Sequence, residues 1–291
     1  AITYQVMCLA AQHKANNMAA ISRRLLGRKG GMAVSILYTL LMATTAGAMI
    51  TGMGELTRLM LPWHGAYGFG IVWAVLLGGW GAFHGMKAMA WGGGWLLPSC
   101  LLLNGLLLRC PPPLPVAMGT PAYAGAWALP FACAYAAMNI ALGSGVLCEV
   151  GPLLGARARR YAAFSFFAIL LCLLGSANAV LLLHAKTLRD AVLPMVILSR
   201  ALGKTGYWLC AACLALAMQT SLVAMLRSLT GMFAERFSFP LAWLCALWTA
   251  LAMACIGFER IMGIAYPLMG WLSVGALLCL LACYWKERRR A

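Results

Sequence analysis

The sequence has 291 residues, of which 64% are hydrophobic and only 10% are charged, and its mean hydropathy is +0.87. A soluble domain has about 45–50% apolar and about 25% charged residues, so this composition excludes a soluble protein and indicates an integral membrane protein. The net charge of +16 does not indicate nucleic-acid binding, because the Lys and Arg residues form short clusters between apolar runs rather than a basic domain.

The first 31 residues change from apolar to basic. Residues 1–21 become polar from Gln12 onward, which fits either the final part of a membrane span or an amphipathic helix on the membrane surface. We expect the basic run that follows, SRRLLGRKGG (22–31), to be a cytoplasmic loop. The chain does not begin with Met, and we therefore expect it to be a fragment or a processed chain.

Eight long apolar runs follow, each with roughly the 17–25 residues that a helix needs to cross a bilayer. Their continuous apolar character predicts helices rather than the short alternating segments of a membrane barrel. The predicted spans are Met32–Met53, Phe69–Met86, Met89–Leu108, Ala124–Glu149, Tyr161–Leu183, Tyr207–Leu226, Pro240–Gly257 and Ile264–Trp285. The prediction is therefore one all-α membrane domain with eight complete spans and a partial one.

The segments between the spans predict two outer features and an orientation. A proline-rich loop occupies 109–123 and separates three spans in 32–108 from five in 124–285, and a helix is expected in the outer loop near 190–204. Fourteen Lys and Arg residues fall on one side of the predicted membrane and seven on the other. The basic tail, 286–291, belongs to the richer side, so we expect a cytoplasmic C-terminus in a plasma-membrane protein.

The span Ala124–Glu149 is apolar, yet it contains Pro130, Asn139, Gly143, Ser144 and Gly145. These residues can loosen a helix, and broken helices are where transporters hold solutes and ions. The competing interpretation is that the small residues form a contact face for a neighbouring helix. The carboxylate of Glu149, near the end of this span, could carry a proton, but we favour an ion pair with Arg157 or Arg159.

Thr220 and Ser221 lie inside another apolar run, LALAMQTSLVAML. Their adjacent hydroxyl oxygens could coordinate a hard cation, or they could donate hydrogen bonds to the carbonyls one turn earlier in their own helix. The six acidic residues and four histidines are scattered, without a catalytic pair or a metal-ligand spacing, so we expect no enzymatic activity and no resident cofactor. Cys210-x-x-Cys213 is a weak redox or metal signal, because no second ligand pair accompanies it.

Several motifs resemble the YkvI-like membrane proteins of the amino acid–polyamine–cation transporter superfamily. They are LLMATTAGAMITGMGE (40–55), AYAAMNIALGSGVLCEVGPL (134–153), LPMVILSRALG (193–203) and LALAMQTSLVAMLRSL (214–229). The resemblance implies a LeuT-like bundle of two inverted five-helix repeats. It also implies that the eight spans are helices three to ten, because no glycine-rich GAGFASGQE-like first helix is present, so that the bundle is truncated at its N-terminus.

The resemblance further implies residue roles. It places substrate contacts at Asn139, Gly143 and Ser144 on a broken sixth helix, and a sodium site at Thr220 and Ser221 on helix eight. The resulting prediction is a secondary transporter of a small, amino-acid-like solute, coupled to Na⁺ or H⁺ by alternating access. The alternative is a non-transporting membrane protein, either a truncated relic or a ligand sensor on the same fold. The expected partners are the lipid bilayer and a small solute, without nucleic acid.

Overall fold

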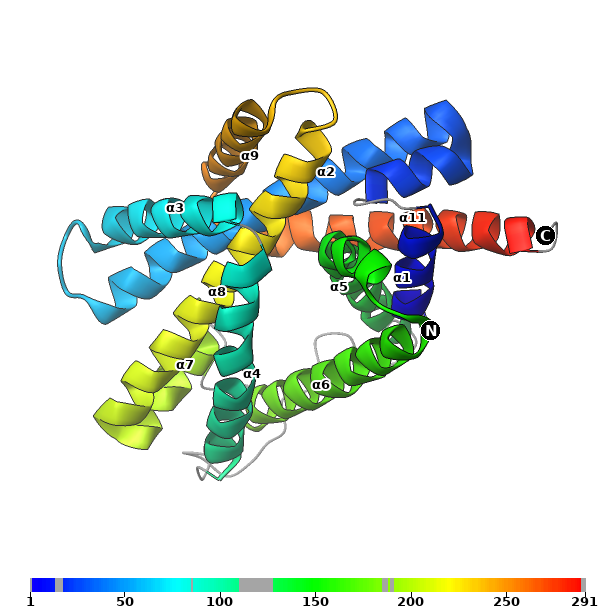
Figure 1. Cartoon of the computed structure of the whole chain (residues 1–291). Helices are drawn as coiled ribbons and strands as arrows, with labels where there is room; N and C mark the ends of the chain where they lie inside the picture. The colour runs from blue at the N-terminus through cyan, green and yellow to red at the C-terminus, as the bar shows by residue number, and fades with distance from the viewer. Residues whose placement is uncertain are drawn as a thin grey trace. The chain divides into compact units, whose positions relative to one another are not determined.

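The computed structural model describes residues 2–13, 18–84, 86–109, 128–184, 188 and 191–288. Within these ranges the regular structure is helical and contains no strand, which confirms the all-α prediction (Figure 1). The main helices are α1 (Ile2–His13), α2 (Met18–Met60), α3 (Ala66–His84), α4 (Met86–Leu108), α5 (Ala128–Val150), α6 (Ala156–Leu183), α8 (Gly203–Phe233), α9 (Phe239–Ala254) and α11 (Tyr266–Arg288). The short elements are η2 (Gly151–Leu153), α7 (Pro194–Ser199), η3 (Arg200–Leu202), α10 (Phe258–Arg260) and η4 (Ile261–Ala265).

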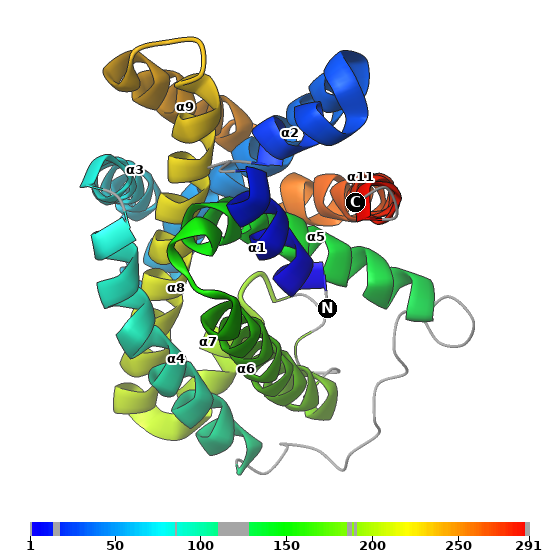
Figure 2. The same cartoon turned by 45° about the vertical axis from the view of Figure 1, so that its right-hand side comes forward.

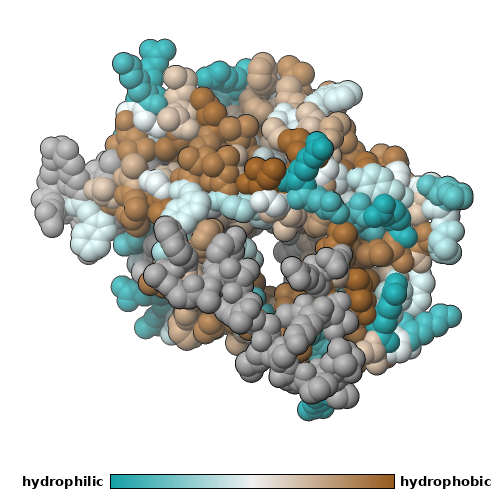
Figure 3. Space-filling model, turned by 180° about the vertical axis from the view of Figure 1, so that it is seen from behind, coloured by the Kyte–Doolittle hydropathy of each residue, from teal (hydrophilic) through white to brown (hydrophobic). Residues whose placement is uncertain are grey.

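Six helical stretches of the described chain are long and apolar enough to cross a membrane. Large apolar side chains are also exposed; on α6 these include Phe164, Phe167 and Leu171, which are 60–70% exposed. Figure 3 shows broad areas of such apolar residues on the described surface. A surface of this kind is covered by lipid rather than water, so the structure supports a membrane protein.

Each of the eight predicted spans overlaps a helix, but two of them provide only a short apolar stretch. α9 has 16 residues, and the apolar stretch found in α4 covers only Pro98–Leu108. The eight-span count and the LeuT-like arrangement therefore stay predictions. The proline-rich loop 109–123 lies, except for Arg109, outside the described residues. The short helix α7, followed by η3, falls in the segment where we expected a loop helix.

The basic segment 22–31 is helical, whereas we expected a loop. It forms the beginning of α2, and the helix changes direction at Gly27, where φ is 71° and ψ is −173°. A positive φ of this size is costly for residues with a Cβ atom, so glycine is required at this point. Two helical segments therefore meet at Gly27.

α5 runs without interruption from Ala128 to Val150, so the expected broken helix is wrong. Pro130 causes no break because it lies in the first turn, where its missing N–H is not needed. Gly143 keeps helical geometry, and the Asn139 amide donates to the Tyr135 carbonyl one turn earlier, at 2.8 Å. The polar and small residues of this span are accommodated within a regular helix.

The described chain divides into two compact units, with the first comprising residues 1–48, 126–163 and 222–291. In this unit α5 packs against both α1 and α11 (Figures 1 and 2). Glycine allows neighbouring segments of this unit to approach each other closely. If residue Gly151 carried a Cβ atom, that atom would lie 2.8 Å from the Met7 carbonyl oxygen, and a Cβ atom at Gly47 would lie 2.8 Å from the Ala254 nitrogen. Backbone-to-backbone packing of this kind is typical of membrane helices.

The second unit comprises residues 49–125 and 164–221, and polar bonds join its helices. The Asn104 amide of α4 donates to the Ser176 hydroxyl of α6 at 2.9 Å. The Tyr207 hydroxyl of α8 donates to the Leu59 carbonyl of α2, also at 2.9 Å. Such bonds satisfy polar groups that would otherwise be exposed to hydrocarbon.

Candidate functional site

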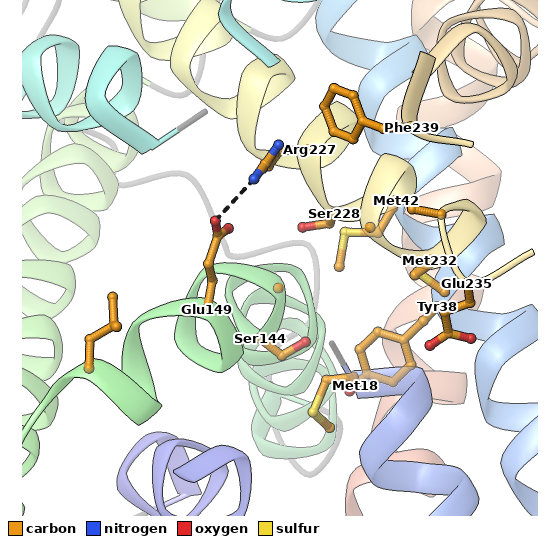
Figure 4. Close-up of a pocket in the computed structure, with 14 residues that line it drawn as sticks. Met18, Tyr38, Met42, Ser144, Glu149, Arg227, Ser228, Met232, Glu235 and Phe239 are labelled. Atoms are coloured by element: carbon orange, nitrogen blue, oxygen red, sulfur yellow. Dashed lines mark hydrogen bonds and ion pairs between the residues drawn. The ribbon is translucent and has the colours of Figure 1, made fainter. Parts of the chain in front are cut away.

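A cavity of about 570 Å³ lies inside the first unit. This volume falls within the range of small-molecule binding sites. Side chains and backbone from four helices line it, together with the segments that follow α5 and α8 (Figure 4). The lining residues are Met18, Tyr38 and Met42 of α2; Ser144, Gly145, Glu149 and Leu153 of α5 and η2; and Arg227, Ser228, Gly231, Met232, Ala234, Glu235 and Phe239 of α8, the turn after it and α9.

An ion pair between Glu149 and Arg227 forms one side of the cavity (Figure 4). The Arg227 Nη2 atom lies 3.5 Å from the Glu149 Oε1 atom, and each side chain is 31% exposed. The guanidinium also lies 5.7 Å from the centre of the Phe239 ring, within cation–π range. The predicted ion pair of Glu149 is therefore present, but its partner is Arg227 and not Arg157 or Arg159.

A second ion pair joins Arg23 of α2 to Glu235 in the turn after α8. Glu235 lines the cavity, and its carboxylate charge is balanced by Arg23. Met18, on the same helical segment as Arg23 and before the bend at Gly27, is also part of the lining. The short segment that precedes Gly27 therefore covers part of the cavity and is held there by an ion pair.

The Tyr38 hydroxyl is the most conspicuous polar group of the cavity. Tyr38 is only 2% exposed, and its hydroxyl has no hydrogen-bond partner within the described chain. The Ser144 hydroxyl lies beside it and interacts with it, but outside strict hydrogen-bond geometry. Ser144 instead donates to the Ala141 carbonyl. A buried hydroxyl without a partner costs about 1–3 kcal/mol, so this group is available to a bound ligand.

Gly145 brings α5 and α8 into contact beside the cavity. A Cβ atom at this position would lie 2.0 Å from the Ser228 Oγ atom and 2.9 Å from its Cβ atom. Both contacts are shorter than real Cβ contacts, so the two helices could not approach this closely with any larger residue. This supports the interpretation of the small residues as a contact face.

The predicted substrate contacts are only partly brought together. Ser144 lines the cavity and is fully buried. Asn139 and Gly143 are on the same helix but are not among the lining residues, and the Asn139 amide is used within its own helix. Their role in substrate binding stays a prediction.

The predicted ion ligands, Thr220 and Ser221, belong to the second unit. The Thr220 hydroxyl donates to the carbonyls of Leu216 and Ala217, at 2.9 and 3.1 Å. This is the bonding within one helix that the alternative interpretation expects. Its oxygen still has lone pairs that could accept a cation. Gln219, the preceding residue, donates its amide to the Ala74 carbonyl of α3 at 3.3 Å. The ion-binding role of Thr220 and Ser221 stays a prediction.

Among the described residues, no group of three His, Cys, Asp or Glu side chains is placed to hold a metal ion. Cys210 and Cys213 are both reduced and buried, and the Cys210 thiol donates to the Met195 carbonyl at 3.4 Å. These two cysteines therefore pack as small side chains within the apolar helix α8.

No protein family, curated protein or solved structure matches this chain. The resemblance to the YkvI-like proteins thus rests on the short motifs alone and stays a hypothesis.

Sequence reasoning missed two residues that define the cavity. Arg227 is 78 residues from Glu149 in the sequence, and a basic residue near the end of a span usually indicates only membrane orientation. Tyr38 lies in an apolar run, SILYTLLMA, where an aromatic residue usually packs in the interior. The available signal was that both Arg227 and Glu149 fall at span ends on the same predicted side, where opposite charges often pair.

Proposed function

We propose that this chain is a secondary transporter of a small, zwitterionic, amino-acid-like solute, and that the cavity of the first unit is its solute site. The observation that carries the proposal is the loose pair of opposite charges on the cavity wall, Glu149 and Arg227. A second observation supports it: the described chain contains helices that are long and apolar enough to cross a membrane.

The ion pair matches a zwitterion because it offers one partner for each ligand charge. A carboxylate can bind the guanidinium of Arg227 in a bidentate manner, and an ammonium group can donate to Glu149. The two protein charges are 3.5 Å apart and part-exposed, so their mutual attraction is of the modest kind, about 0–1 kcal/mol, found for solvated pairs. Separating them to admit a ligand therefore costs little.

Transport is driven in this proposal by a Na⁺ or H⁺ gradient. Thr220 and Ser221 are the proposed sodium ligands, because hydroxyl oxygens suit a hard cation. Glu149 is the corresponding candidate for a proton-coupled mechanism, because it is a carboxylate on the cavity wall.

Uptake by proteoliposomes tests this proposal. The purified chain should accumulate radiolabelled leucine when a Na⁺ or H⁺ gradient is imposed, and it should lose this uptake when the gradient is dissipated. An ionophore control separates coupled uptake from leakage. Leucine binding without gradient-dependent uptake in any ion condition would contradict transport.

A second candidate function is ligand binding without transport, as in a membrane-embedded sensor. The uninterrupted α5 favours it, because the expected break at a mid-membrane solute site does not occur. Both functions use the same cavity, but only a transporter moves the solute across the membrane. Saturable binding without uptake would select the sensor.

A further inference from the structure

We infer that the cavity selects zwitterions with an apolar side chain, with the headgroup between Glu149 and Arg227 and the side chain against Met18, Met42 and Met232. This inference rests on the proposed function and adds to it the chemical class of the solute and its direction in the site.

The cavity has two chemically different ends. Figure 4 shows Arg227 and Glu149 facing each other on one side, whereas Met42, Met232, Tyr38 and Met18 lie away from this pair. The three methionines come from both α2 and α8, so the apolar wall is built by two helices. Methionine side chains are flexible and polarizable, and they adapt to apolar groups of different shapes.

The charged end fixes the headgroup. A ligand with only one charge would engage Arg227 or Glu149 and leave the other without a close partner. A zwitterion replaces both halves of the original pair, so each protein charge keeps an opposite charge next to it. The Phe239 ring beside Arg227 holds the guanidinium in place, which reduces the freedom lost when a ligand binds.

The other end disfavours charged side chains. Met18 and Met42 are 3% and 1% exposed, so a charge placed against them would lose its water without gaining a partner. Glu235 is the exception in the lining, and its carboxylate is already paired with Arg23. The Tyr38 hydroxyl, buried next to Ser144, can serve one polar atom of the ligand at the border between the two ends.

Competition binding with the purified full chain in lipid nanodiscs tests this selectivity. The probe is radiolabelled L-leucine, and the competitors are L-methionine, glycine, L-glutamate, L-lysine, 4-methylpentanoate and 3-methylbutylamine. The last two are leucine without its ammonium and without its carboxylate. Methionine should compete about as well as leucine, because apolar side chains of similar volume are treated alike. Glycine should be about 30-fold weaker, because it lacks the buried side chain.

Glutamate and lysine should each be weaker than leucine by roughly 100-fold, because their side-chain charge would be buried without a partner. The two single-charge analogues should be weaker by roughly 10- to 150-fold, because each loses a hydrogen bond to a charged group, about 1.5–3 kcal/mol. If glycine, glutamate and lysine compete as well as leucine, the selectivity is wrong and the proposed function survives. If leucine and the other zwitterions all fail to bind to the correctly folded protein, the proposed function itself fails. Folding is checked independently by thermal unfolding.

A charge introduced at the apolar end provides a gain-of-function test. Met232 is part-exposed, so Met232→Glu can be accommodated, and it should shift the preference from leucine toward lysine by about tenfold through the new ion pair. The matched control is Ser238→Glu, which adds the same charge at an exposed position outside the cavity lining and should leave the competitor ranking unchanged. An unchanged ranking in the folded Met232→Glu protein, or the same shift in both variants, would overturn the inference.

Discussion

Two regions of α8 carry polar residues within the same apolar helix, and they use them differently. In residues 219–221 the Thr220 hydroxyl donates to carbonyls of its own helix, and the Gln219 amide nitrogen donates to the backbone of α3, while the buried Gln219 Oε1 atom has no hydrogen-bond partner among the described residues. In residues 227–233 Arg227 and Ser228 line the same cavity as Tyr38. Unused hydrogen-bonding capacity occurs in both regions, so the difference teaches that a polar residue in a membrane helix indicates a ligand site most strongly when it also lines a cavity.

Removing the guanidinium of the cavity should have the largest effect. Arg227→Gln should weaken leucine binding roughly 10- to 150-fold, because a hydrogen bond to a charged group contributes about 1.5–3 kcal/mol. Equilibrium binding of radiolabelled leucine measures this. The matched control is Arg58→Gln, which breaks the Arg58–Glu55 pair of the second unit and should leave binding unchanged. Equal losses in both variants would mean that the effect is structural.

A substitution at the contact between α5 and α8 should have the next largest effect, in this case on the stability of the protein. Gly145→Ala should destabilise the protein by about 1–3 kcal/mol, because its new methyl group would overlap Ser228. Gly175→Ala is the control: it also lies within a helix, but its Cβ would meet nothing within 4 Å, so stability should be equal or slightly higher. Unfolding in detergent measures both variants.

The double variant Gly145→Ala/Ser228→Gly adds a test of the same contact. It should recover most of the stability lost in Gly145→Ala, because Ser228→Gly removes both atoms that the new methyl group would overlap. A double variant that is no more stable than Gly145→Ala would show that the contact does not limit the approach of the helices.

Tyr38→Phe should move stability and binding in opposite directions. The empty protein should become about 1 kcal/mol more stable, because a buried hydroxyl without a partner is removed. Leucine binding should weaken severalfold, because the ligand loses one hydrogen bond. Thermal unfolding and binding are measured on the same preparation. A loss of stability in the empty protein would show that the hydroxyl already has a partner.

Thr220→Val should have the smallest effect on stability, within about 1 kcal/mol, because the lost hydrogen bond lies within one helix. If Thr220 is a sodium ligand, as we propose, the sodium concentration needed for half-maximal uptake should rise. Uptake measured over a sodium series gives this value. An unchanged sodium dependence would assign the hydroxyl to helix packing alone.

The sequence was sufficient to predict the all-helical class, and each predicted span overlaps a helix. This succeeded because a membrane span is a local property that depends on length and composition. The same local reasoning failed at α5, where Gly143, Ser144 and Gly145 suggested a broken helix. The structure shows a continuous helix, in which Gly145 allows α8 to approach. Small residues can either interrupt a helix or allow a second helix to approach it closely. Only the position of the neighbouring helix distinguishes these two roles.

The candidate site was harder to predict, because it depends on contacts between distant parts of the chain. The sequence predicts an ion pair of Glu149 with Arg157 or Arg159, the nearest arginines along the chain, whereas its partner in the structure is Arg227. Arg157 and Arg159 follow the short turn after α5, whereas Arg227 reaches Glu149 through the packing of α8 on α5. Tyr38 gave no signal in the sequence, since its significance is an unsatisfied hydroxyl that only the packed structure reveals.

The central claim, that the cavity of the first unit holds a zwitterionic solute, is tested most directly by photo-crosslinking. A leucine analogue with a diazirine side chain is bound to the full chain in nanodiscs and irradiated, and the modified residues are mapped by mass spectrometry. The account predicts modification of Met42, Met232 or their immediate neighbours in the cavity, abolished by excess leucine. Leucine-sensitive modification confined to residues outside the cavity lining would contradict it.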